Sequence, residues 1–167
     1  EPAVVRRDVH QLLFTGSLGY LPNRDAVRWL LEMASLAHDI EPRTSLVVAG
    51  SSPPPSLINA ARTTSWLSVT GSRDSFADLF AASGMAVIPL RAGGGTRLKA
   101  LEAFAAGLPV VSTSKGVEGL DVRDGEHFLL AETTAQFVEA MERLWSNPGL
   151  YAAVATAAFD LVQRSYS

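Results

Sequence analysis

The stretch of sequence that decides the fold is MAVIPLRAGGGTRLKALEAFAAGLPVVS, residues 85–112. A short apolar run at 85–90 predicts a strand, residues 97–106 predict a helix, and residues 109–112 predict a second strand. Gly107, directly after the helical run, is typical of a helix C-terminus. A strand, a helix and a second strand in this order form the repeating unit of parallel α/β sheets.

The same alternation extends over the rest of the chain. The predicted strands are apolar on both faces, which is typical of a parallel sheet buried between helices. We therefore expect residues 1–167 to form a single Rossmann-like α/β domain, with a doubly wound parallel sheet of about six strands and helices on both faces. Pro22 and Asn23 are expected just before the first helix. The further predicted strands are 12–15, 45–49, 66–70 and 128–131, and the further helices are 25–37, 57–62, 76–82, 134–145 and 150–164.

Composition narrows the function classes. The formal net charge of −3 argues against nucleic-acid binding, which would show as a basic excess. The absence of cysteine excludes disulfides, thiolate zinc sites and cysteine nucleophiles, and it fits a reducing compartment. No apolar run approaches the roughly 20 residues that span a bilayer. The sequence begins with Glu1 rather than Met and shows no signal peptide, so we expect it to be part of a longer protein.

Three glycines, Gly93, Gly94 and Gly95, stand between a predicted strand and a predicted helix. Glycine lets the backbone turn sharply and lets a ligand approach the main chain. The unpaired N–H groups at the start of the helix favour an anion there. Arg97 and Lys99 in the first turn are disfavoured by the helix dipole unless a polyanion binds beside them. The residues alone fit a phosphate site, or a flexible turn followed by a solvated basic pair.

Two further features lie near the glycine loop and after the first predicted strand. Glu102 is a carboxylate among small apolar residues and needs a partner; ribose hydroxyls would serve, and a salt bridge or an exposed position is the alternative. The loop GSLGY at 16–20 follows the first predicted strand and could bring main-chain N–H groups to a phosphate. It matches neither the dinucleotide fingerprint nor a P-loop.

Five segments of the sequence match a known pattern, namely Gly16, Val69-Thr70-Gly71, Val87-Ile88-Pro89-Leu90, LEAFAAGLPVV at 101–111 and DGEHFLL at 124–130. Together they resemble the C-terminal domain of group 1 (family 4) retaining glycosyltransferases. The resemblance implies the C-terminal half of a GT-B fold, in which two Rossmann-like domains face each other across a cleft. The C-terminal domain binds the nucleotide-sugar donor, and the N-terminal domain, expected to be absent here, mostly binds the acceptor.

The resemblance also implies roles for particular residues. Glu102 matches the second glutamate of the family's Glu-x7-Glu motif, which hydrogen-bonds the ribose. Gly16 matches a glycine near the donor diphosphate, while Thr96 and Arg97 lie where the family handles the diphosphate and the donor sugar. Arg97 and Glu102 are the expected catalytic residues. The expected donor-binding set is Gly16, Ser17, Gly71, Gly93, Gly94, Gly95, Thr96, Arg97, Lys99 and Glu102.

The chain departs from the family pattern at the expected phosphate site. Gly94 stands in place of the first motif glutamate, and Ser17 and Asn23 stand where many members carry basic residues. The family's usual phosphate-binding cations are therefore missing from their loop. Arg97 and Lys99, or Arg24, are the candidates to replace them.

The resemblance implies transfer of a sugar, with retention, from a nucleoside diphosphate sugar to a glycan or lipid-linked acceptor, as in polysaccharide biosynthesis. The sequence contains no Asp-x-Asp pair of the kind that holds a divalent metal in other transferases. We therefore expect no metal or other cofactor. The expected location is cytoplasmic, with peripheral association of the full-length protein at the inner membrane face. We expect this part alone to lack activity. A non-catalytic nucleotide-, sugar- or protein-binding module, or a sugar-nucleotide epimerase on the same architecture, are the alternatives.

Overall fold

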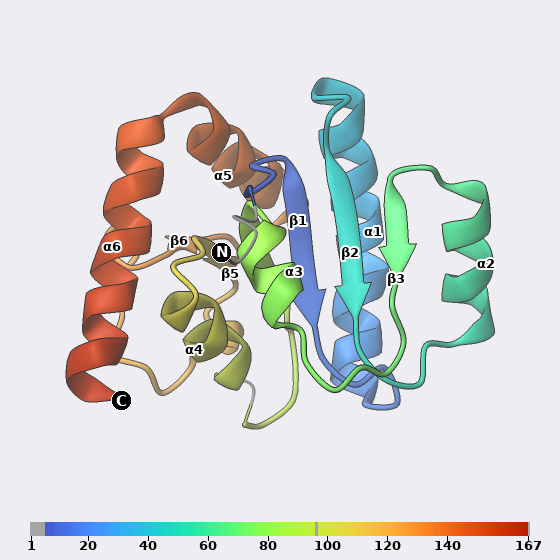
Figure 1. Ribbon diagram of the computed structural model, residues 1–167, viewed down its shortest axis with the longest axis horizontal. Coiled ribbons are helices and arrows are strands. Elements are labelled where there is room, and N and C mark those ends of the chain that lie inside the picture. Colours follow the sequence, from blue (N-terminus) through green and yellow to red (C-terminus); the bar gives the residue numbers. More distant parts are fainter. Residues whose placement is uncertain (1–5, 96, 167) are drawn as a thin grey trace, which may run out of the picture.

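The computed structural model of the chain describes residues 6–95 and 97–166. They form a six-stranded sheet in the order β3-β2-β1-β4-β5-β6, and every strand pair is parallel (Figure 1). This confirms the predicted doubly wound α/β fold. The strands are β1 (Gln11–Thr15), β2 (Ser45–Ala49), β3 (Leu67–Val69), β4 (Met85–Ile88), β5 (Val110–Ser112) and β6 (Leu129–Leu130).

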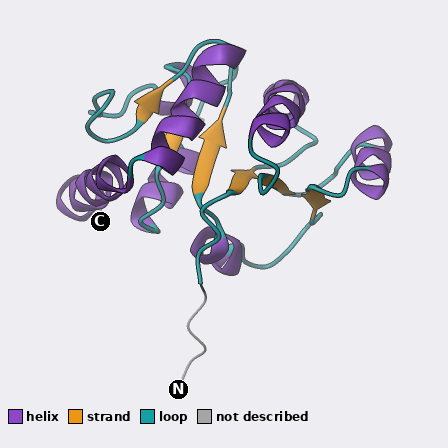
Figure 2. Cartoon of the chain, turned by 90° about the horizontal axis from the view of Figure 1, so that it is seen from above, coloured by secondary structure: helices purple, strands orange, loops and turns teal. Residues whose placement is uncertain are grey.

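Helices cover both faces of the sheet, as Figure 2 shows. Helix α1 packs against α5 on one face, and α4 packs against α6 on the other. The helices are α1 (Leu21–Ile40), α2 (Pro55–Thr63), α3 (Ala77–Ala82), α4 (Leu98–Ala105), α5 (Thr134–Ser146) and α6 (Pro148–Ser165), with a short 3₁₀ turn, η1 (Lys115–Val117), after β5.

The core explains why the strands read as apolar on both faces. Leu12, Leu13 and Phe14 of β1 are all buried, although successive side chains point to opposite faces of the sheet. In β4 every residue is buried as well. Because helices pack on both faces, neither face of these central strands meets water.

The strand order places a topological switch point between β1 and β4, which are neighbours in the sheet. The chain leaves β1 towards β2 on one side, and it leaves β4 towards β5 on the other. The loops that follow the two strands therefore diverge and leave a crevice, which is where ligands bind in this class of fold.

Several element bounds differ from the sequence-based expectation; α1, for example, ends at Ile40 instead of residue 37, and α2 begins at Pro55, two residues early. Helix α1 begins at Leu21 instead of Asp25, so Pro22 and Asn23 lie in its first turn and not before it. Helix α6 likewise begins at Pro148, two residues early. In both cases proline suits the first turn, because its missing N–H would have no partner there. The short turn η1 was not predicted.

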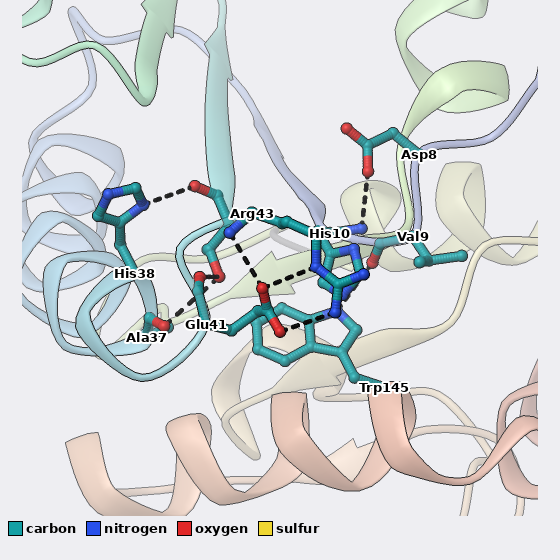
Figure 3. Close-up of polar contacts among 9 residues, drawn as sticks. Asp8, Val9, His10, Ala37, His38, Glu41, Arg43 and Trp145 are labelled. Carbon is teal, nitrogen blue, oxygen red and sulfur yellow. Dashed lines mark hydrogen bonds and ion pairs between the residues drawn. The ribbon is translucent and has the colours of Figure 1, made fainter.

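The amino edge of the sheet carries a cluster of paired polar groups (Figure 3). Arg43 donates two side-chain hydrogen bonds to the Glu41 carboxylate, at 2.8 and 2.9 Å. Trp145 Nε1 donates to the Val9 carbonyl oxygen at 2.8 Å, and its ring lies 5.3 Å from the His10 ring. This amino-edge cluster links the chain segments before β1 and β2 to α5.

The structure also bears on membrane insertion. Within residues 6–95 and 97–166, no helix is both long and apolar enough to cross a bilayer.

Candidate functional site

A pocket of about 310 Å³ opens at the carboxyl edge of the sheet, between the β1–α1 loop and the start of α4. Five residues of the predicted donor-binding set line it: Gly16, Gly94, Gly95, Lys99 and Glu102. The pocket lies at the switch point between β1 and β4, where ligands bind in doubly wound sheets. We call it the switch-point pocket.

A second, larger pocket of about 840 Å³ adjoins it between α3 and α4. Phe76 and Glu102 line both pockets, so the two spaces meet at these side chains. The volumes fall in or near the range of small-molecule sites. Glu102 therefore lies where the two pockets adjoin, and Lys99 lines only the smaller one of these two.

Glycine is needed where the loops meet. Gly16 has a φ of +149°, and a Cβ there would overlap Lys99 Nζ and lie 2.8 Å from Asn23 Nδ2. At Gly50, after β2, a Cβ would overlap the Gly16 carbonyl oxygen. The two glycines therefore let the loops after β1 and β2 touch, and they leave room for the Lys99 ammonium.

The glycine loop after β4 contacts the β1–α1 loop through Tyr20. The Gly94 N–H donates to Tyr20 Oη at 3.3 Å. At Gly93, whose φ is +100°, a Cβ would lie 2.8 Å from Tyr20 Oη and 3.1 Å from Pro22. Gly93 thus serves the close approach of the two loops, while Gly94 and Gly95 line the pocket.

Lys99 reaches back from the first turn of α4 to the end of β1. Its Nζ donates to the Thr15 carbonyl oxygen at 2.5 Å and lies 5.1 Å from the centre of the Phe14 ring. Burial lowers the pKa of Lys99 from 10.5 to about 8, against the opposing effect of the Glu102 carboxylate. The protein therefore holds a cation where its charge is poorly solvated, a cost that a bound anion would offset.

Glu102 is exposed and forms no hydrogen bond or ion pair with another residue in the described part of the chain. Glu102 lines both pockets. A carboxylate only accepts hydrogen bonds, so it suits a ligand that presents hydroxyl or N–H groups. The salt bridge considered from the sequence is absent among these residues; the exposed position is confirmed.

The remaining members of the predicted set lie apart from the pocket wall. The Ser17 hydroxyl oxygen accepts hydrogen bonds from Gly19 N and Ser51 Oγ, at 3.3 and 3.1 Å. Gly71 lines a separate hollow near α2 and β3. Arg97 is exposed, with Nη1 3.7 Å from where a Cβ on Gly119 would stand.

Thr96, also a member of the predicted set, lies outside the described residues. The part of the chain described here contains no group of three or more His, Asp or Glu side chains placed to hold a metal ion.

Tyr20, Asn23 and Phe76 also line the switch-point pocket, although the predicted donor-binding set did not include them. Asn23 was placed before the first helix, whereas its position in the first turn of α1 turns it inwards and buries it. Pro22 was the available signal, since proline is common at the first positions of a helix. Phe76 gave no local signal, because only the folded chain brings the start of α3 next to α4.

The sequence of this chain matches the family model described as glycosyl transferases group 1 over residues 9–147. No curated protein matches the sequence significantly.

Three solved structures illustrate the similarity of fold. The C-terminal domain of a glycosyl transferase group 1 family protein, LpcC, from Francisella tularensis is 20% identical, with a TM-score of 0.80 over 98% of this chain and 88% of that one. TarM from S. aureus, in a complex that includes UDP, is 15% identical, with a TM-score of 0.82 over 100% and 35%. Alr3699/HepE from Anabaena, in complex with UDP and glucose, is 15% identical, with a TM-score of 0.79 over 95% and 44%.

These likenesses show the fold, and the family match covers most of the sequence. The chain spans about a third of the length of TarM and under half that of HepE. From the six-stranded parallel sheet and the match over residues 9–147, we conclude that this chain belongs to the group 1 glycosyl transferases.

Proposed function

We propose that this chain is the donor-binding domain of a retaining glycosyltransferase, which takes its sugar from a nucleoside diphosphate sugar. The observation that carries the proposal is that Lys99 and Glu102 both line one pocket at the switch point. One side chain offers a cation that lacks an anionic partner at hydrogen-bond distance among the described residues, and the other offers a carboxylate without a hydrogen-bonded partner there. A diphosphate joined to a pentose has the groups that both require.

The diphosphate is proposed to lie beside Lys99 and the glycine loop. Lys99 Nζ has three N–H groups, and one of them is used by the Thr15 carbonyl oxygen. Gly94 and Gly95 line the same pocket and permit close approach to the main chain. The start of α4 adds a partial positive charge from its helix dipole.

The pentose is proposed to bind Glu102, with the base in the 840 Å³ pocket beyond it. Glu102 stands where the two pockets meet, so a ligand bound through its hydroxyls would extend in both directions. The Phe76 ring also belongs to both pockets and offers an apolar wall to the nucleoside. UDP is present in the TarM and HepE structures, and it is therefore the probe of choice.

The proposed chemistry is departure of a nucleoside diphosphate from the sugar, with retention at the sugar carbon. Catalysis then depends on stabilising the negative charge that develops on the leaving diphosphate. Lys99 and the glycine-loop amides supply this stabilisation in our proposal, without a metal or another cofactor. Arg97, exposed at the rim, would contribute by turning from Gly119 towards the phosphate.

The acceptor is proposed to be a glycan or a lipid-linked sugar, held by another domain of the full-length protein. The chain spans 35% and 44% of two neighbours that carry UDP, which is consistent with a partner domain in proteins of this kind. We propose a cytoplasmic protein that works at the inner face of the membrane in polysaccharide biosynthesis.

Titration of the chain with UDP and with UDP-glucose tests the proposal. We expect saturable binding, which Glu102→Gln weakens about tenfold because the pentose hydroxyls lose a charged acceptor. Arg97→Ala is expected to have a smaller effect, since its guanidinium lies away from the pocket wall. Glu142→Gln on α5 removes the same charge from an exposed position and is the matched control.

The result of this titration separates the candidate functions. Equal affinities of the wild type and Glu102→Gln would contradict the proposed site. No binding of either nucleotide would favour a module that binds a protein partner.

A further inference from the structure

Asn23, in the first turn of α1, has an unusual environment. Its side chain is 4% exposed, and Oδ1 has no hydrogen-bond partner among residues 6–95 and 97–166. Buried polar atoms are nearly always paired in folded proteins, so an unpaired one calls for an explanation. Asn23 also lines the switch-point pocket, beside Gly16.

The orientation of the Asn23 amide is fixed by its other end. Nδ2 donates to the Ser17 carbonyl oxygen at 2.8 Å, an interaction that the oxygen end could not make. A rotation that exchanged the two ends would place two oxygens together. Oδ1 is therefore held as a hydrogen-bond acceptor in the interior of the β1–α1 turn.

The nearest cation is the Lys99 ammonium. A Cβ on Gly16 would overlap Lys99 Nζ and would lie 2.8 Å from Asn23 Nδ2 and 3.1 Å from its Cγ. The ammonium and the amide, with Nδ2 as its nearest atom, therefore border the same small space, which is open because residue 16 has no side chain. Lys99 donates to the Thr15 carbonyl oxygen and has two more N–H groups to place.

We propose that Asn23 is a positioning residue for Lys99: when an anion binds in the switch-point pocket, Oδ1 accepts a hydrogen bond from the ammonium and holds it against the phosphate. This inference rests on the proposed function. A lysine with the acceptors Thr15 O and Asn23 Oδ1 behind it keeps its third N–H for the ligand.

Burial argues that Asn23 acts through Lys99 and not on the ligand itself. Its Oδ1 atom is closed off from solvent, whereas the long Lys99 side chain extends from the pocket to the amide. Asn23 stands at a position where the resemblance leads one to expect a basic residue, and Lys99 would replace the missing cation. The cation comes from α4, and α1 supplies an acceptor to hold it.

A double-mutant cycle tests this role, with UDP as the probe and NMR titration as the measurement, because NMR follows binding up to millimolar dissociation constants. Asn23→Leu keeps the side-chain volume and removes both polar atoms. We expect it to weaken UDP binding about tenfold in the wild-type background, the usual effect of losing a charge-assisted hydrogen bond. In the Lys99→Met background the same substitution is expected to change the affinity less than twofold.

A pH series supplies a readout that a merely structural residue would not change. The neighbours of Lys99 from β1 and α1 are the uncharged Phe14, Thr15 and Asn23, and the charged group that acts on it is Glu102. Since the pKa of Lys99 is about 8, UDP affinity is expected to fall above that pH. In Asn23→Leu the fall should begin at lower pH, because the ammonium has lost an acceptor.

Two results would overturn the proposed role of Asn23, and a third would overturn the proposed function. An equal loss of affinity from Asn23→Leu in both backgrounds would show that Asn23 acts independently of Lys99, and would overturn this inference alone. An unchanged pH profile in Asn23→Leu would do the same. A wild-type chain that binds no UDP at any pH would instead overturn the proposed function. Thermal unfolding of each variant confirms that the titrated protein is folded.

Discussion

The two edges of the sheet differ in how completely certain of their polar side chains are paired. At the amino edge, the Glu41 carboxylate receives two side-chain hydrogen bonds from Arg43, and the Trp145 indole donates to a backbone oxygen (Figure 3). At the carboxyl edge, neither the Glu102 carboxylate nor the buried Asn23 Oδ1 has a hydrogen-bonded partner among the described residues. The amino-edge cluster pairs these polar groups within the protein, whereas Glu102 and Asn23 Oδ1 at the carboxyl edge present groups that a ligand or its cation could pair with.

The buried, incompletely paired groups at the carboxyl edge lower the folding stability of the empty protein. Burying the Lys99 ammonium and leaving a buried acceptor unpaired both cost folding free energy. Such costs are typical of functional sites, where the arrangement suits the bound state and not the empty one. The amino-edge cluster shows that the same chain pairs its polar groups where no ligand is expected.

The largest expected effect concerns the close contact of the loops at the carboxyl edge. Gly50→Ala places a Cβ on the Gly16 carbonyl oxygen, and neither atom can turn away, because the oxygen belongs to the main chain and the Cβ is bonded directly to it. We expect a loss of about 3 kcal/mol in the free energy of unfolding, the upper range for overpacking. Urea denaturation measures it, with Gly149→Ala in α6 as the control, where the nearest atom is 3.4 Å away. A loss below about 1 kcal/mol would show that the loops separate easily.

A smaller effect, of the opposite sign, is expected at Lys99. Because burial lowers its pKa from 10.5 to about 8, the charged form destabilises the fold at neutral pH. Lys99→Met should raise the free energy of unfolding by about 2 kcal/mol at pH 7 and weaken UDP binding. Arg143→Met on α5 removes a charge from an exposed position and should leave stability nearly unchanged.

The stability that Lys99→Met gains over the wild type should decrease as pH rises. Below pH 8 the folded and unfolded chains both carry the Lys99 proton, so the full cost is present. Between pH 8 and 10.5 the unfolded chain binds more protons at this site, so the wild type gains stability relative to Lys99→Met as pH rises. A constant difference across this range would contradict the burial of the charge.

The smallest effect is expected at the amino edge. The Arg43 guanidinium lowers the pKa of Glu41 from 4.5 to about 2. The pair is at the surface, where solvent and salt weaken it. Glu41→Gln should therefore lower the melting temperature at pH 7 only slightly. The difference should shrink as pH falls from 4.5 towards 2, and thermal melts across that range measure it. A decrease in melting temperature as large as the one that Gly50→Ala causes would contradict this expectation, because it would mean that the exposed pair contributes strongly to the stability of the fold.

Much of the fold could be predicted because its signals are local. Apolar runs such as Leu12–Phe14 and Met85–Ile88 identify central strands, and Gly107 identifies the end of α4. Helix starts were predicted less well, since Pro22 and Pro148 lie inside the first turns of their helices. The turn η1 gave no periodic signal, because three residues are too few to show one.

The site could be predicted only in part. Strand ends and glycines pointed to Gly16, Gly94, Gly95, Lys99 and Glu102, and the structure brings these five together. The sequence did not show that Lys99 points back to Thr15, because this contact joins residues 84 positions apart. It also could not separate Arg97, directed towards Gly119, from Lys99 in the same turn.

The central claim is that the carboxyl edge, and not the amino edge, binds a nucleoside diphosphate. Titration of the ¹⁵N-labelled chain with UDP tests it most directly, since each glycine amide and each tryptophan indole gives its own signal. We expect the amide signals of Gly16, Gly94 and Gly95 to shift in a saturable way, while the Trp145 indole signal stays in place. Shifts at Trp145 without shifts at these glycines, or no saturable shift anywhere, would contradict the account.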